Sequence, residues 1–161
     1  MRAVLQRVNE ARVVVSGNLV AEIGRGLLVF LGAGKGDTEK DVTWMVEKIV
    51  GLRIFPDQQD RMNLSVTDIG GQLLVVSQFT LFGDCRKGKR PSFVGALEPA
   101  EAERLCDLFI KLVKDRGLVC GSGIFAADML VSLINDGPVT LLVDSRLPRH
   151  GGNEGFSSSP S

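Results

Sequence analysis

The chain has 161 residues, and its 19 Lys plus Arg balance 19 Asp plus Glu, so the formal net charge is zero. This balance excludes a general electrostatic attraction to nucleic acid, so any such affinity has to come from local clusters of basic residues. No apolar run approaches the roughly 20 residues that span a bilayer, and the N-terminal segment lacks the apolar core of a signal peptide. Three widely spaced cysteines without a CxxC pair indicate free thiols in a reducing cytoplasm.

The first 32 residues predict successive strands of one sheet. Residues 2–15 mix apolar and polar positions and end in three valines, and turn residues at 16–18 precede a second strand-like segment at 19–23. After a second turn at 24–26, residues 27–31 form a continuous apolar run. A run of this kind indicates a strand that is buried on both faces.

A glycine-rich loop and a helix follow. The segment 32–38 contains Lys35 but lacks the GxxxxGK[S/T] spacing of a phosphate loop, so we interpret it as a loop that leads into a helix. Thr38 and Asp41 resemble a capping box, and Gly51 is a stop signal. The expected buried face of this helix comprises Val42, Met45, Val46 and Ile49. Residues 52–55 then predict a short strand, and residues 57–62 predict a polar loop.

The segment 73–81 organises the rest of the chain. It begins as the apolar run of a buried strand and then carries Ser77, Gln78 and Thr80, whose burial is unfavourable unless each finds a hydrogen-bond partner. Residues 83–90, which follow directly, are dense in positive charge. A polar strand end beside a cationic loop predicts a pocket next to an anion-binding surface.

The last third of the domain predicts a loop, a helix and a pair of strands. Residues 86–97 indicate an irregular loop, and Pro99 stands where a helix favours proline. The helix presents an apolar stripe that includes Cys106 as a buried thiol and ends before Gly117. Residues 129–134 and 139–143 predict a hairpin-like pair joined through Asn135-Asp136-Gly137-Pro138. We expect one domain over residues 1–146 and a disordered tail over residues 147–161.

Side-chain chemistry alone leaves alternatives open. The hydroxyls of Ser77 and Thr80 suggest a nucleophile, but a nucleophilic hydroxyl needs a base, and the only histidine is His150 in the tail. The same hydroxyls could instead cap the end of the strand. The basic segment Arg86, Lys87, Lys89 and Arg90 could contact phosphates or could be an ordinary solvated loop. One histidine and no paired cysteines predict neither a metal site nor a cofactor.

Two motifs add what spacing cannot supply. Ser77-Gln78-Phe79-Thr80-Leu81 and Asn135-Asp136-Gly137-Pro138-Val139-Thr140 together resemble the paired signature of the D-aminoacyl-tRNA deacylases. The segments 62–66, 87–93 and 125–129 also resemble parts of that family, and the resemblance extends over about residues 1–145.

The resemblance implies an α+β fold, with a β-barrel-like antiparallel or mixed sheet flanked by two main helices. It implies a cytoplasmic homodimer whose active site crosses the subunits and which binds the terminal adenosine and acceptor end of aminoacyl-tRNA. It implies hydrolysis of the ester of D-aminoacyl-tRNA, and removal of glycine mischarged on alanine tRNA. In the family the Gly-Pro bond is cis, and it enters the pocket of the other subunit to exclude L-amino acids.

The same resemblance assigns roles to individual residues of this chain. Selection would belong to Gly137 and Pro138. The remaining assignments are catalytic for Ser77, Gln78, Phe79 and Thr80, pocket for Ala126, Ala127, Met129 and Asn135, and tRNA contact for Arg86, Lys87, Lys89 and Arg90.

The expected mechanism leaves most of the chemistry to the backbone and the substrate. Backbone N–H groups near Phe79, and near Ala126 and Ala127, would hold the carbonyl oxygen as charge develops. The ribose 2′-hydroxyl would help to activate water. Two other readings are a non-catalytic tRNA-binding module and a general serine esterase, and the missing base argues against the esterase.

Two positions depart from the family pattern. Ser122 stands where threonine is usual, and Ala126 stands where glycine is usual. An extra methyl group on a pocket wall typically costs about 1–3 kcal/mol unless the neighbours adjust. We therefore expect these positions to influence the substrate range.

Overall fold

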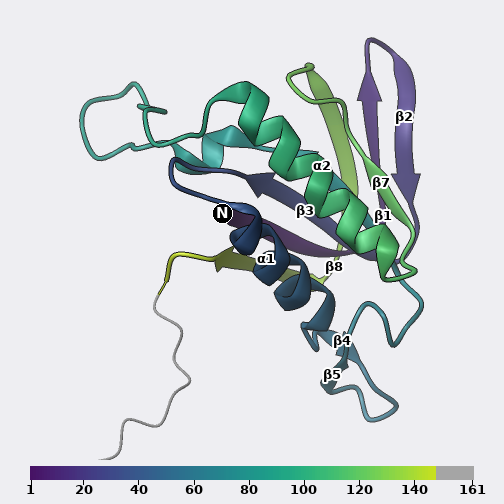
Figure 1. The fold of residues 1–161 in the computed structure, drawn as a ribbon. Coiled ribbons are helices and arrows are strands. Elements are labelled where there is room, and N and C mark those ends of the chain that lie inside the picture. Colours follow the sequence, from purple (N-terminus) through teal and green to yellow (C-terminus); the bar gives the residue numbers. More distant parts are fainter. Residues whose placement is uncertain (148–161) are drawn as a thin grey trace, which may run out of the picture.

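The computed structural model describes residues 1–147. It consists of a curved mixed sheet with β1 at its centre and two helices packed against it (Figure 1). Strand β1 (Arg2–Val15) pairs antiparallel with β2 (Asn18–Ile23), β3 (Gly26–Gly32) and β8 (Met129–Asp144). Strand β3 pairs parallel with β6 (Gln72–Ser77), and β6 pairs parallel with β7 (Cys120–Ser122). The three strands predicted in the first 32 residues are confirmed.

The sheet curls until it almost closes. Strand β2 lies against β6 and β7, and at Gly121 an added Cβ would be 3.2 Å from the Cβ of Ala21. Inside the curl a small apolar core forms, which includes Val8, Val13, Leu28, Leu74 and Val76. This barrel-like mixed sheet with two helices is the predicted α+β architecture.

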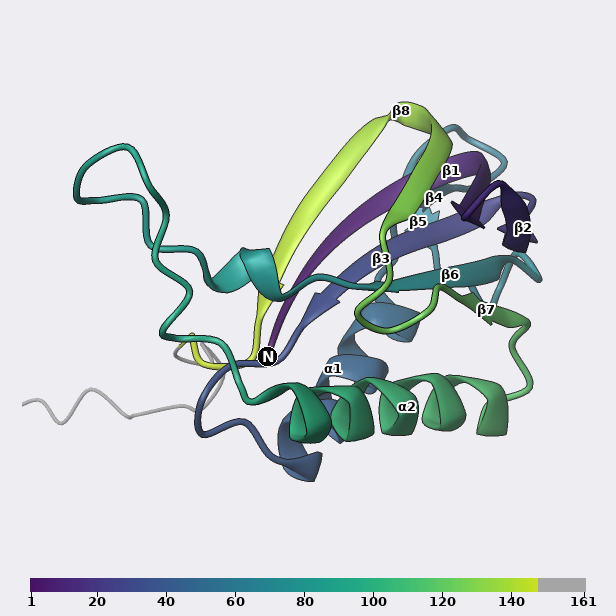
Figure 2. The ribbon, with the colours of Figure 1, turned by 90° about the horizontal axis from the view of Figure 1, so that it is seen from above.

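Two helices cover the other face of the sheet (Figure 2). Helix α1 (Glu39–Gly51) has the predicted capping box, in which the Thr38 N–H donates to Asp41 Oδ2 at 2.9 Å. Helix α2 (Pro99–Asp115) begins with proline in its first turn. Their apolar faces meet the sheet in the main core, which contains the predicted Val42, Met45, Val46, Ile49 and Cys106, together with Leu105, Phe109 and Val113 of α2.

The segment 52–64 differs from its prediction. Of the strand predicted over residues 52–55, only Phe55 is in a strand, β4 (Phe55–Pro56). Strand β4 pairs with β5 (Met62–Leu64), which begins at the end of the predicted polar loop. The turn between them is stabilised by Asp57, whose Oδ1 accepts the N–H groups of Gln59 and Arg61 at 2.8 and 3.1 Å. Two-residue and three-residue strands are too short to show a period in the sequence.

The predicted hairpin over residues 129–143 is wrong. Residues 129–144 form the single strand β8, and both halves pair with β1: Met129–Asn135 with residues 8–15, and Thr140–Asp144 with residues 2–6. The register shifts on either side of Val8, so residues 136–139 bulge out of the strand instead of reversing it. A bulge and a turn use similar residues, and only the length of the partner strand distinguishes them.

Two further observations complete the fold. None of the helices within residues 1–147 is long and apolar enough to cross a bilayer. The predicted tail, apart from residue 147, and His150 with it, lie outside the described residues.

Candidate functional site

A cavity of about 740 Å³ opens where β6 ends. Ser77 is the last residue of β6, and after Gln78 the chain enters the short 3₁₀ helix η1 (Phe79–Phe82). The cavity is bordered by the end of β3, by the segment 93–99 and by the start of β8. The predicted site residues that line it are Ser77, Gln78, Phe79, Ala126, Ala127 and Met129.

Strand β6 ends at Ser77, and Thr80 lies in the 3₁₀ helix that follows, so Ser77 and Thr80 do not share a strand face. Gln78 donates its N–H to the carbonyl of Leu31 at 2.8 Å, which is the last link to β3. Thr80 is exposed, does not line the cavity, and accepts a hydrogen bond from Gln78 Nε2 at 2.5 Å. The geometry therefore separates the two hydroxyls that a shared nucleophilic role would have required to meet.

Backbone N–H groups stand at the same strand end. Phe79 and Thr80 open η1, and the first N–H groups of a helix have no partner within it. On the opposite wall, the Ala127 N–H donates to the Ile124 carbonyl at 3.3 Å and is already engaged. The N–H of Phe79 is thus the stronger candidate for binding a carbonyl oxygen in the cavity.

Ala126 has an unusual backbone conformation on this wall. Its φ of 58° is in the left-handed region, which glycine adopts readily and alanine does not. Ala126 therefore has the backbone conformation that favours the glycine implied by the sequence resemblance, and it adds a methyl group to the cavity wall.

Gly137 and Pro138 do not line the cavity of their own chain. They lie in the bulge of β8, and the peptide bond between them is cis. The φ of Gly137 is 122°, and a Cβ there would lie 2.7 Å from Arg7 Nη2 and 2.9 Å from Val139 Cγ2. Only glycine fits this position, because both the backbone angle and the surrounding space exclude a side chain.

Arg7 holds the bulge from beneath, and sequence reasoning missed it. Its side chain is only 9% exposed; Nε donates to the Asp136 carbonyl at 3.2 Å and pairs with Asp136 Oδ2 at 3.1 Å, and Nη1 donates to the Ile54 carbonyl at 2.6 Å. An arginine among the apolar positions of a buried strand was the available signal, since a buried charge requires partners.

Asn135 also shapes the bulge instead of lining the cavity. Its Nδ2 donates to the carbonyls of Arg7 at 3.0 Å and Val139 at 2.9 Å, so it spans the base of the bulge. The pocket role predicted for Asn135 is not what the geometry of the single chain shows.

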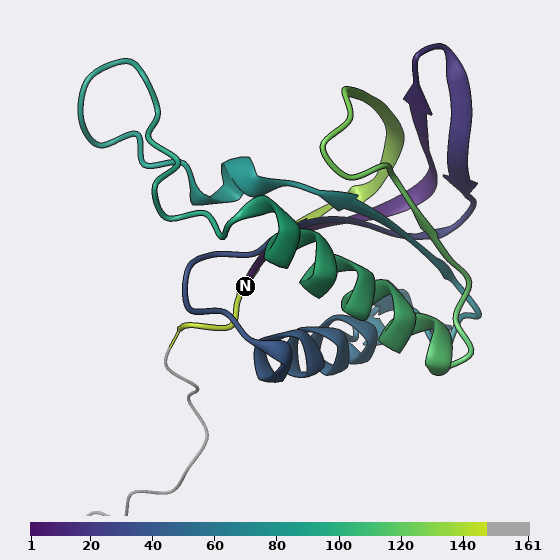
Figure 3. The same ribbon diagram turned by 45° about the horizontal axis from the view of Figure 1, so that its top comes forward.

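The predicted basic residues lie on a loop that projects from the body of the molecule (Figure 3). We call residues 85–91 the basic loop; its base is closed by two hydrogen bonds between Asp84 and Ser92, at 2.7 and 3.0 Å. Arg86 forms a two-pronged ion pair with Asp84, which lowers the pKa of that carboxyl. Within residues 1–147, Lys87, Lys89 and Arg90 have no carboxylate partner and are exposed.

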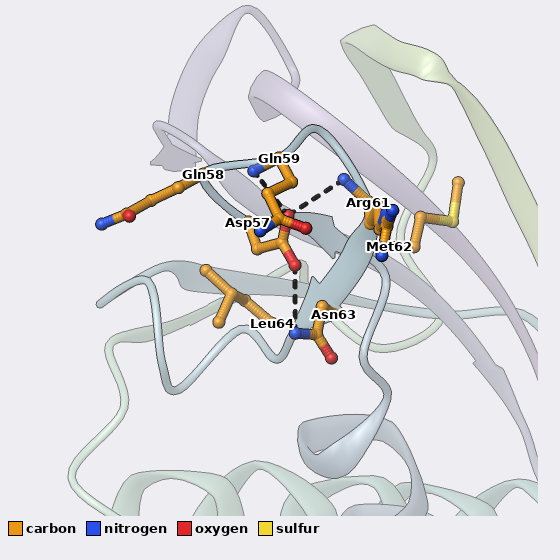
Figure 4. A pocket seen from close by; sticks show the side chains of 7 residues that line it. All are labelled: Asp57, Gln58, Gln59, Arg61, Met62, Asn63 and Leu64. Carbon is orange, nitrogen blue, oxygen red and sulfur yellow. Dashed lines mark hydrogen bonds between the residues drawn. The ribbon is translucent and has the colours of Figure 1, made fainter.

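A second hollow of about 640 Å³ lies at the β4–β5 turn (Figure 4). Asp57 occupies its centre with three hydrogen bonds, the third from Asn63 Nδ2 at 3.0 Å. The backbone N–H groups of Arg61 and Gln59 lower the pKa of Asp57. The carboxylate of Asp57 is thus engaged by the turn itself.

One cysteine thiol is among the groups that line the cavity. Cys106 borders it from α2, but burial raises the pKa of this thiol to about 12, so it is not a nucleophile at neutral pH. Within the described part of the chain, no three His, Cys, Asp or Glu side chains gather as a metal site. The arrangement offers backbone donors, a hydroxyl and an apolar wall.

Comparison with known proteins agrees with this geometry. The profile of the family described as "D-Tyr-tRNA(Tyr) deacylase" matches residues 4–144. The chain belongs to the D-Tyr-tRNA(Tyr) deacylase family.

Several relatives of the family are similar over almost their full length. The D-aminoacyl-tRNA deacylase of Myxococcus xanthus (strain DK1622) is 61% identical over 92% of this chain and 97% of its own. The D-aminoacyl-tRNA deacylase of Halothermothrix orenii (strain H 168 / OCM 544 / DSM 9562) is 57% identical over 90% of this chain and 97% of its own.

Solved structures share the fold. One described as "c-Myc DNA Unwinding Element Binding Protein" has a TM-score of 0.85 at 39% identity and covers 89% of this chain and 98% of its own. Another, of a probable eukaryotic D-amino acid tRNA deacylase, has a TM-score of 0.74 at 19% identity, covers 88% and 97%, and supports the fold alone.

Proposed function

We propose that this protein hydrolyses the ester that joins a D-amino acid to the terminal adenosine of tRNA, in the cavity at the end of β6. D-aminoacyl-tRNA deacylation, a hydrolase activity, follows from membership of the family. The observation that carries the finer assignment is the cavity itself, which brings Ser77, Gln78 and Phe79 together with the wall formed by Ala126 and Ala127.

The proposed chemistry needs no side-chain base. The Phe79 N–H, unpaired within η1, holds the carbonyl oxygen as negative charge develops, and one such donor is typically worth about 2.7–4 kcal/mol. The ribose 2′-hydroxyl helps to activate the attacking water. Support comes from the site itself: no histidine occurs within residues 1–147, and Thr80 does not line the cavity.

Selection is proposed to come from a second subunit. Gly137 and Pro138 are fixed on the bulge of β8, away from the cavity of their own chain. In a homodimer the partner's copy of this bulge enters the cavity, and its carbonyls exclude the side chain of an L-amino acid. Glycine has no side chain, so glycine mischarged on alanine tRNA passes the same gate and is removed.

The outer surface of β8 supports this dimer. β8 pairs only with β1 in the described part of the chain, so one of its edges is free. Leu130, Ile134 and Leu142 are exposed on it, to 72%, 52% and 84%. A free edge with exposed apolar side chains favours association with another chain.

The test compares side-chain and substrate contributions. Ser77→Ala and Thr80→Ala are expected to keep activity on D-aminoacyl-tRNA within about tenfold, whereas tRNA that ends in 2′-deoxyadenosine is expected to be hydrolysed very slowly. Release of the D-amino acid is measured under single-turnover conditions. Inactive alanine variants together with rapid hydrolysis of the deoxy substrate would show that a side chain performs the reaction.

A second candidate, a tRNA-binding module without catalysis, is favoured by Lys87, Lys89 and Arg90 of the basic loop, which are exposed and have no carboxylate partner within residues 1–147. Turnover separates the two functions. An enzyme releases more amino acid than there is protein, whereas a binding module protects the ester from spontaneous hydrolysis.

A further inference from the structure

Two phenylalanine rings lie exposed at the mouth of the cavity. The side chains of Phe79 and Phe93 are 57% and 37% exposed, and their rings meet edge to face with centroids 5.1 Å apart and an interplanar angle of 71°. Gly83 supports the pair, because a Cβ there would lie 3.0 Å from Phe93 Cε1. The rings are therefore held in place by neighbouring atoms while part of their surface faces solvent.

A cation lies on the same rim. Lys35 also lines the cavity, is exposed, and has no carboxylate partner within residues 1–147. Its position is fixed by the backbone, since its N–H donates to the Gly95 carbonyl at 3.0 Å and the Leu97 N–H donates to the Ala33 carbonyl at 3.1 Å. These bonds tie Lys35 to the segment that carries Phe93.

The basic loop ends next to Phe93 of the same pair. Ser92, which closes the base of the loop against Asp84, directly precedes Phe93. Phe93 therefore follows directly after the basic loop, whose Lys87, Lys89 and Arg90 have no carboxylate partner within residues 1–147, and Lys35 lines the cavity together with both rings. Exposed aromatic rings flanked by positive charge are the elements with which proteins bind single-stranded nucleic acid.

We propose that the Phe79–Phe93 pair stacks the base that precedes the terminal adenosine, and that Lys35 contacts the phosphate between these two nucleotides. This inference rests on the proposed function, which places the terminal adenosine and its amino acid in the cavity. The tRNA strand that precedes the terminal adenosine is single-stranded and negatively charged. In this arrangement it leaves the cavity across the rim, where the two rings and Lys35 lie. Stacking on a π face tolerates any base, so this contact adds affinity without selecting among tRNAs.

The test uses Phe93→Leu, with Phe93→Tyr as the conservative rescue and Val119→Ala as a control at an exposed apolar side chain that does not line the cavity. Three substrates are compared: D-aminoacyl-tRNA, the same tRNA with an abasic nucleotide before the terminal adenosine, and D-aminoacyl-adenosine. We expect Phe93→Leu to raise KM for the intact tRNA about tenfold, the scale of one base–aromatic stack. kcat should change less than twofold, and Phe93→Tyr and Val119→Ala should match the parent protein.

The short substrate and the abasic tRNA decide the interpretation. D-aminoacyl-adenosine should be hydrolysed equally by the parent protein and Phe93→Leu, and the abasic tRNA should bind the parent about tenfold more weakly, with no further loss in the variant. Lys35→Met should raise KM for both tRNAs, and Lys48→Met, on α1, is its matched control. Equal KM values for the parent and Phe93→Leu, or an equal loss on the short substrate, would overturn the proposal.

Failure of the inference is distinguishable from failure of the proposed function. If the parent protein does not deacylate any D-aminoacyl-tRNA, the function fails, whereas stacking is still read from fluorescence anisotropy of a labelled single-stranded tRNA 3′ end with and without the abasic position. Sedimentation of Phe93→Leu is measured in parallel. A change in its oligomeric state would show that a second copy of the chain covers the ring pair, and that result contradicts base stacking.

Discussion

The rim of the cavity and the bulge of β8 are built in opposite ways. The rim carries exposed aromatic rings, the exposed Lys35 and a backbone N–H without a partner in its helix. The bulge has its arginine, asparagine and backbone carbonyls joined in hydrogen bonds, and its glycine has no room for a side chain. The difference indicates that the groups on the rim are available to bind a ligand, whereas the groups at the bulge keep its backbone rigid.

Removing the support of the bulge should have the largest effect. Arg7→Met leaves Asp136 and the Ile54 carbonyl without their partner, and breaking a buried ion pair typically costs about 3–5 kcal/mol. Because Asp136 is 29% exposed, we expect about 3 kcal/mol, together with increased hydrolysis of L-aminoacyl-tRNA. Urea unfolding and the ratio of D to L rates measure the two effects. Unchanged stability would contradict the rigidity assigned to the bulge.

Gly137→Ala tests whether the bulge requires glycine at this position. The new methyl group would meet Arg7 Nη2 and Val139 Cγ2, and alanine is strained at a φ of 122°. Such backbone strain typically costs about 1–3 kcal/mol. We expect a loss of about 2 kcal/mol in the free energy of unfolding and a loss of chiral selection. Gly36→Ala is the control, since it also has a positive φ but open space around it, and it should lose stability without losing selection.

Ala126→Gly should have a smaller effect, at the cavity. Glycine relieves the left-handed strain at a φ of 58°, worth about 1–2 kcal/mol, but its greater freedom in the unfolded chain offsets roughly half of that. We expect a gain of about 0.5 kcal/mol in the free energy of unfolding, measured in urea. The loss of the methyl group should also speed hydrolysis of bulky D-aminoacyl-tRNAs severalfold, relative to small ones. A loss of stability would mean that the methyl group packs favourably against the wall.

Thiol labelling gives the smallest effect and sharpens the contrast between rim and interior. Cys85, on the basic loop, is exposed, whereas Cys106 and Cys120 are buried. Burial raises the pKa of Cys106 to about 12 and that of Cys120 to about 11, so both remain protonated at pH 8. We expect a thiol-reactive dye at pH 8 to label one cysteine rapidly, and Cys85→Ser to abolish that label. Rapid labelling of two or more cysteines in native protein would contradict the burial of Cys106 and Cys120.

Much of the fold was predictable because its signals are local. Helix α1 carries its own capping box and apolar face, and α2 carries its own proline and apolar stripe. The short strand predicted over residues 52–55 was placed too early, since β4 is Phe55–Pro56, and β5 was missed, because their pairing depends on the turn at Asp57 and not on a repeating pattern. The candidate site was predictable only in part: six predicted residues line the cavity, but Thr80 and Asn135 do not.

Sequence alone determined the family, the order of the main strands and helices, and the position of the polar strand end, because motifs and apolar periods lie within short stretches of chain. Tertiary structure decided that residues 129–144 are one strand, that Arg7 lies beneath Gly137 and Pro138, and that Phe79 and Phe93 meet at the cavity mouth. Each of these depends on a contact between segments far apart in the chain. Which distant residue becomes the partner is set by strand pairing and core packing, and no local pattern records it.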